Sequence, residues 1–103
     1  MSIKQKIQGI IKTSLEKNNI EFDVEKIIVE TPKDTKNGDY STNIALVLTK
    51  ILNENPMTIA AKIMDSISDD TIEKVEIAKP GFINIFLTTF NVLKAVFPRV
   101  WNI

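Results

Sequence analysis

The chain has 103 residues, of which 44% are hydrophobic and 25% charged, and its 13 basic side chains are balanced by 13 acidic ones. This size and composition are typical of one globular domain with its own core. The sequence contains neither cysteine nor histidine, which excludes disulfides, histidine-dependent nucleophilic triads and the usual zinc sites.

The first predicted element is an amphipathic helix that ends at Asn18-Asn19. Ser2 and Gln5 have the spacing of a capping box at its start. Gly9 lies inside the helix, where glycine costs about 1 kcal/mol relative to alanine, so we expect a neighbour to pack closely against it. The apolar stripe consists of Ile3, Ile7, Ile10, Ile11 and Leu15.

The next segment combines strands with a polar connection. Residues 24–30 are rich in β-branched side chains and predict a strand. Residues 31–38 contain a proline and an Asn-Gly pair, which indicate a loop. Residues 39–41 are expected to form a short return strand.

Two helices are predicted next. Residues 44–52 are nearly all apolar, which favours a central helix covered on more than one side, with Ile51 in the core. Asn55-Pro56 supplies an N-cap and a first-turn proline for a second helix. The buried stripe of this second helix is expected to consist of Ala60, Ile63, Met64 and Ile67.

The last predicted elements are a hairpin and a closing helix. Strands at 72–77 and 82–87 are joined by the turn Lys79-Pro80-Gly81. The alternation of a strand puts Phe82, Asn84 and Phe86 on the face opposite to the aliphatic residues between them. A helix is expected to begin at residue 88 or 89 and to end before Pro98.

This order of elements predicts an α+β, two-layer fold. Short connections favour an antiparallel sheet of about four strands with the helices packed mainly on one face. We expect residues 1–103 to form a single domain, in which residues 91–103 are an atypical tail or the start of a linker. The chain lacks a signal-peptide pattern and any run of about 20 apolar residues, so we expect a soluble, cytoplasmic protein without membrane contact.

Two segments resemble a known family. Residues 38–46, Gly-Asp-Tyr-Ser-Thr-Asn-Ile-Ala-Leu, resemble the Gly-Asp-Tyr/Phe-Ala/Ser-Thr/Ser-Asn segment of bacterial arginyl-tRNA synthetases. Residues 75–84 resemble that family's Ala-x-Pro-Gly-Phe-Ile-Asn strand. The two motifs occur in the family's order, and the resemblance to its N-terminal additional domain covers roughly residues 1–90.

The resemblance implies a function in tRNA recognition. In the family this domain lies against the D-loop at the outer corner of tRNA(Arg), where an aromatic ring contacts a nucleotide and an amide hydrogen-bonds to it. The matching positions here are Phe82 and Asn84, with Lys79 at the turn. The resemblance implies no cofactor and no metal for this domain, because ATP is used by the separate catalytic domain, its second partner. This chain lacks the histidines of the catalytic signature, so we expect no ligase activity from it alone.

Alternatives remain open at this stage. Phe82 is also compatible with burial in the core, since large aromatic side chains are mostly buried. Asparagine is disfavoured inside a strand, so Asn84 should either face solvent or serve a specific partner. The competing function is a protein–protein interaction module that docks through the face of Phe82 and Phe86 or through the tail that contains Trp101. An autonomous enzyme is disfavoured because the chain lacks a suitable set of catalytic groups.

Overall fold

The computed structural model describes residues 2–88. Along this part of the chain the elements follow the predicted order of helix, short strands, two helices and a hairpin. Their bounds are α1 Ile3–Lys17, the 3-10 helix η1 Val24–Lys26, β1 Val29–Glu30, the 3-10 helix η2 Thr35–Asn37, β2 Tyr40–Thr42, α2 Ile44–Leu52, α3 Pro56–Asp65, β3 Ile72–Ala78 and β4 Phe82–Leu87. The predicted closing helix and the tail at 91–103 lie outside the described residues.

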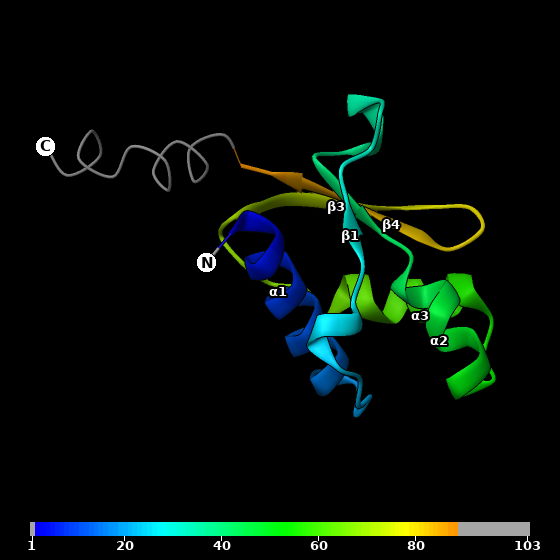
Figure 1. The fold of residues 1–103 in the computed structure, drawn as a ribbon. Coiled ribbons are helices and arrows are strands. Elements are labelled where there is room, and N and C mark those ends of the chain that lie inside the picture. The colour runs from blue at the N-terminus through cyan, green and yellow to red at the C-terminus, as the bar shows by residue number, and fades with distance from the viewer. Residues whose placement is uncertain (1, 89–103) are drawn as a thin grey trace, which may run out of the picture.

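The four strands form one antiparallel sheet in the order β1-β2-β4-β3. The three helices lie on one side of this sheet, while the loop between β1 and β2 projects away on the other side (Figure 1). The predicted α+β class, with helices packed on one face of a four-stranded sheet, is therefore confirmed.

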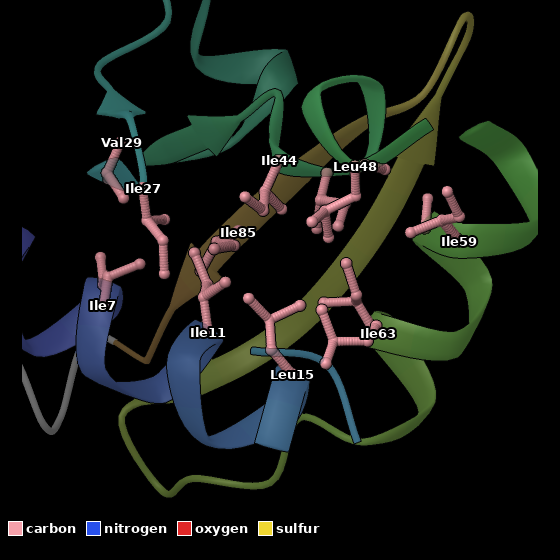
Figure 2. Packing of buried hydrophobic residues seen from close by; sticks show 14 of the residues in the cluster. Ile7, Ile11, Leu15, Ile27, Val29, Ile44, Leu48, Ile59, Ile63 and Ile85 are labelled. Carbon is pink, nitrogen blue, oxygen red and sulfur yellow. The ribbon is translucent and has the colours of Figure 1, made fainter. Parts of the chain in front are cut away.

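The core lies between the helices and the inner face of the sheet. Side chains from α1, α2 and α3 point toward those of β4 and of the segment that leads into β1 (Figure 2). Burial of each such aliphatic side chain stabilises the fold by about 1.5–3 kcal/mol. Among residues 2–88 the largest fully buried aliphatic side chains are Ile7, Ile11, Leu15, Ile27, Ile44, Leu48, Ile59, Ile63, Ile83 and Ile85.

Local sequence signals set the ends of the helices. At the start of α1, the Ser2 hydroxyl accepts from the Gln5 amide at 3.1 Å and the Gln5 side chain accepts from the Ser2 amide at 2.9 Å. This is the predicted capping box. At the start of α3, the Asn55 side-chain oxygen accepts from the Met57 amide at 2.8 Å, and Pro56 occupies the first helical turn.

Three local expectations were wrong. The strand predicted at 24–30 is shortened, because the Asp23 carboxylate accepts from the Glu25 amide at 3.0 Å and a 3-10 turn forms instead. Helix α2 is covered on one side only, with Val47 40% and Ile51 60% exposed. Gly9 has no close neighbour, since a Cβ built there would meet nothing within 4 Å.

No helix between residues 2 and 88 is both long enough and apolar enough to cross a bilayer.

Candidate nucleic-acid interface

The sheet face away from the helices, which we call the open face, carries the predicted site residues. Its side chains form rows because the strand registers place them next to one another. The first row holds Ile28, Asn43, Phe82 and Ala78, and the second row holds Glu30, Ser41, Asn84 and Glu76.

The first row lies where β1 and β2 reach the end of the sheet. Ala78 pairs directly with Phe82 on the β3 side. On the other side, Thr42 pairs with Ile83, so the next residue, Asn43, lies beside Phe82. In the same way Val29 pairs with Thr42, which brings Ile28 beside Asn43.

The turn of the β3–β4 hairpin is held against the start of α3. A Cβ added to Gly81 would lie 2.8 Å from Pro56 Cβ and 3.4 Å from Leu46, so this contact requires glycine. The Gly81 amide also donates to the Ala78 carbonyl at 2.9 Å, and the Lys79–Pro80 peptide bond is cis. The contact fixes the position of the turn and of the strand that begins after it.

The three predicted site residues have different environments. Phe82 is 37% exposed on the open face, so its ring is not a core side chain. Lys79 is exposed at the turn. Asn84 lies on the same face as Phe82 but is only 6% exposed, because strands flank it on both sides. The predicted division of the strand is present, since Ile83 and Ile85 are fully buried on the inner face.

Asn84 has a specific partner inside the protein. The Ser41 hydroxyl donates to Asn84 Oδ1 at 3.0 Å across the β2–β4 pair. This bond occupies the carbonyl end of the amide and leaves Nδ2 as the group that Asn84 can offer to a ligand. The bond therefore orients the amide with its donor end available.

Phe86 does not extend an apolar surface along the open face. Its ring is partly buried, and Lys74 Nζ lies 4.5 Å from the ring centroid. Lys74 Nζ also lies 3.5 Å from a carboxylate oxygen of Glu76. This end of the open face is consequently covered by paired charges.

The Gly-Asp pair at 38–39 joins β2 to β4. Asp39 Oδ2 accepts from the Leu87 amide at 2.8 Å, and the Asp39 amide donates to the Ile85 carbonyl at 2.9 Å. Gly38 has φ +94°, and an added Cβ would lie 2.8 Å from the Ile85 carbonyl oxygen. The Gly38-Asp39 pair therefore has a structural role, because it ties the start of β2 to the end of β4.

A hollow of about 180 Å³ lies beside Phe82, which we call the Phe82–Ile28 pocket. It is lined by Ile28, Glu30, Ser41, Asn43 and Phe82. Sequence reasoning did not find its other walls. One signal was present, because Ile27, Ile28 and Val29 are three consecutive apolar residues, and alternation can bury only one side of such a run.

The other hollows of the described residues are weaker candidates for a binding site. A wider hollow of about 730 Å³ lies at the end of α1, but there the Lys12 ammonium is already bonded to the Phe22 carbonyl. Among residues 2–88 no group of three or more carboxylates could hold a metal ion. The open face is therefore the candidate interface, and its chemistry is that of an exposed ring beside amide and hydroxyl groups.

Comparison with known proteins agrees with the motifs on this face. The family described as "Arginyl tRNA synthetase N terminal domain" has a sequence model that matches residues 2–87. These residues include both the Gly-Asp pair at 38–39 and the β3–β4 hairpin. The chain belongs to this family.

Relatives of this N-terminal domain are whole ligases. A Staphylococcus epidermidis arginine–tRNA ligase is 49% identical over 87 residues, covering 82% of this chain and 16% of the relative. The Staphylococcus carnosus arginine–tRNA ligase is 48% identical over 99 residues, covering 94% of this chain and 18% of the relative. The chain thus spans less than a fifth of the length of these relatives.

Solved structures show the same fold. The arginyl-tRNA synthetase of Plasmodium falciparum superposes with a TM-score of 0.76 at 28% identity, over 91% of this chain and 17% of that one. The Thermus thermophilus arginyl-tRNA synthetase also gives a TM-score of 0.76, over 91% of this chain and 15% of that one. Its identity is 21%, so this second likeness concerns the fold alone.

Proposed function

We propose that this domain contacts tRNA(Arg) at the D-loop, on the outer corner of the folded tRNA, and supports arginine–tRNA ligation by a separate catalytic domain. Phe82 stacks on an unpaired nucleotide, Asn84 donates a hydrogen bond to it, and Lys79 lies at the edge of the contact. The catalytic domain is the second partner, and ATP is used there.

The observation that carries this proposal is the exposed ring of Phe82 on the open face. An exposed aromatic side chain next to an oriented amide matches the way proteins bind unstacked bases in RNA loops, by stacking and by hydrogen bonds to the base edge. The Ser41 hydroxyl already occupies Asn84 Oδ1, so Asn84 contributes a donor, and the base must supply an acceptor.

The binding energies expected for these contacts favour a role in distinguishing correct from incorrect tRNA. Stacking of one base contributes about 1–3 kcal/mol, and a good hydrogen-bonded pair adds about 1–3 kcal/mol. After the cost of association, the domain alone should bind at roughly 10 μM or more weakly. Attached to a catalytic domain, the same contact becomes intramolecular, and its full energy then separates correct from incorrect tRNA.

Docking of another protein through the Phe82 and Phe86 face is the alternative. The Lys74 ammonium over Phe86 removes that ring from any continuous apolar surface. Because the Phe86 ring is covered in this way, we retain tRNA as the partner. The D-loop nucleotide distinguishes the two functions, since RNA binding should change when this nucleotide is replaced and apolar docking should not.

The proposal is tested by NMR titration of the isotopically labelled chain with a tRNA(Arg) transcript. We expect shifts of the amides around Phe82 and Lys79, and loss of most of these shifts in Phe82→Ala. A preserved amide spectrum should accompany this loss, because the ring is exposed.

The matched control is Ile51→Ala, which also removes an exposed apolar side chain but from α2, on the other side of the sheet. This variant should bind like the unaltered chain. If Phe82→Ala retains the complete set of shifts, Phe82 is not part of the contact.

A further inference from the structure

The outer strand β3 forms one long unpaired edge of the sheet. In the strand order β1-β2-β4-β3, one edge strand, β1, has two residues and the other, β3, has seven. Among residues 2–88 no strand pairs with the outer side of β3. Such an edge presents a row of backbone donors and acceptors to which another strand can be added.

The hydrogen bonds of the neighbouring strand indicate which backbone groups of β3 point outward. The Ile85 carbonyl accepts from the Asp39 amide at 2.9 Å, so the backbone of Ile85 is directed toward β2. Val75 pairs with Ile85 across the β3–β4 ladder. Bonded and non-bonded pairs alternate along an antiparallel ladder, so the N–H and C=O groups of Val75 and Ile77 point to the free edge.

On the open face, β3 carries opposite charges on either side of Val75. The side chains of Lys74 and Glu76 are 53% and 52% exposed, and the ion pair between them is long at 3.5 Å. Lysine at a sheet edge deters unspecific pairing, so an added strand has to match these charges. Antiparallel pairing of two β3 strands about Val75 does so, because Lys74 of each copy lies opposite Glu76 of the other.

Other registers of two β3 strands do not match. A shift by one residue would turn the apolar face of one strand outward. Pairing centred on Lys74 or on Glu76 puts like charges opposite each other. Pairing centred on Ile77 brings Pro80, which has no N–H, opposite Lys74. The register about Val75 is therefore the self-complementary one.

A hollow of about 270 Å³ lies between the end of α3 and the start of β3. In the pairing about Val75, Ile77 of the second copy comes opposite Glu73, which lines this hollow. An apolar side chain of the added strand therefore meets an apolar surface. The half-buried apolar residues of that surface are Met64, Ile67, Ile72 and Val75.

We propose that β3 pairs with β3 of a second copy of this chain, antiparallel and two-fold symmetric about Val75, so that the two four-stranded sheets join into one. A bulge between Ile72 and Lys74 ends the regular part of the edge, so the paired segment is short and the association is weak. The proposal is independent of the proposed function, since pairing at the edge leaves Phe82 on the open face uncovered.

The test is self-association of the 103-residue chain. Sedimentation velocity and amide hydrogen exchange are measured as its concentration is raised toward roughly 1 mM. We expect the mass to approach twice 11.6 kDa. Exchange of the Val75 and Ile77 amides should slow as the dimer forms, because these groups then donate to the second copy.

Charge reversal separates this pairing from other contacts. Lys74→Glu puts a carboxylate opposite Glu76, and Glu76→Lys puts an ammonium opposite Lys74. Each variant alone should therefore self-associate at least about tenfold more weakly. An equimolar mixture of the two should form a heterodimer, because each charged pair between the copies then joins opposite charges.

The control is Lys36→Glu, in the loop between β1 and β2, which makes the same change in net charge as Lys74→Glu. This variant should self-associate like the unaltered chain. A chain that stays monomeric at the highest concentration overturns the proposal, and a mixture of the two β3 variants that fails to associate overturns the register about Val75.

Two further outcomes would also contradict the pairing. If the β3 variants dimerise alone as well as the unaltered chain does, the contact between copies lies elsewhere. If exchange of the Val75 and Ile77 amides is slow at every concentration, the edge is already paired within one copy.

Discussion

At the scale of single residues, polar groups and glycines decide how closely the elements approach. Asp39 links the start of β2 to the end of β4 through the Leu87 amide, and Ser41 links the same strands through Asn84. These bonds lie within and beside the open face, so the residues that hold the sheet together also orient the groups of the candidate interface.

Replacement of two glycines by alanine should have opposite effects on the stability of the domain. Gly9 has open space around it and lies inside α1, so Gly9→Ala should stabilise the domain by about 0.5–1 kcal/mol. Gly38 has a positive φ and lies against the Ile85 backbone, so Gly38→Ala should destabilise the domain by more than this amount. Chemical denaturation measures both, and destabilisation by Gly9→Ala would show that this position is crowded.

At the scale of elements, α2 is a helix with one covered face. Leu48 and Ile44 are buried beneath it, while Val47 and Ile51 remain exposed. The apolar spacing of residues 44–52 predicted the helix itself. It could not predict which stripe is covered, because the sequence is apolar on nearly every side and the packing of α3 and the sheet makes that choice.

The difference in burial between Leu48 and Ile51 predicts that their replacement by alanine has unequal effects on stability. Leu48→Ala should destabilise the domain by about 2–5 kcal/mol, because it leaves a cavity in the core. Ile51→Ala should change the free energy of unfolding by at most about 0.5 kcal/mol. Equal losses, measured by urea denaturation, would mean that Ile51 is buried in solution.

The strands show what local sequence can and cannot predict. The β3–β4 hairpin follows from β-branched residues around Pro80-Gly81, and alternation correctly separates Phe82 from Ile83. The low exposure of Asn84 depends on having strands on both sides, which only the sheet order supplies. The Phe82–Ile28 pocket depends on the registers of three strands, so no local pattern contains it.

At the scale of the whole molecule, the 103-residue chain has a formal net charge of zero, and the open face carries paired as well as unpaired charges. Such a surface gains little from counterion release on binding RNA. The proposed recognition of tRNA therefore depends on a few short-range contacts, which under the proposal discriminate between tRNAs once the domain is attached to a larger enzyme.

The same reasoning predicts no ligase activity from this chain alone. Mixed with ATP, arginine and tRNA(Arg), it should form no arginyl-tRNA above background, because the proposed catalytic domain is separate. Measurement of radiolabelled arginine attached to tRNA checks this directly. Turnover that follows the purified chain would mean that the catalytic groups lie within these 103 residues.

The central claim is that an unpaired D-loop nucleotide lies against the ring of Phe82. Its most direct test is an NMR search for intermolecular NOEs between the ring protons of Phe82 and a tRNA(Arg) transcript labelled only in the D-loop nucleotides. The account predicts NOEs from that ring to the base protons of one D-loop nucleotide. Absence of these NOEs, with the tRNA-induced shifts gathered on α2 around Val47 and Ile51 instead, would contradict it.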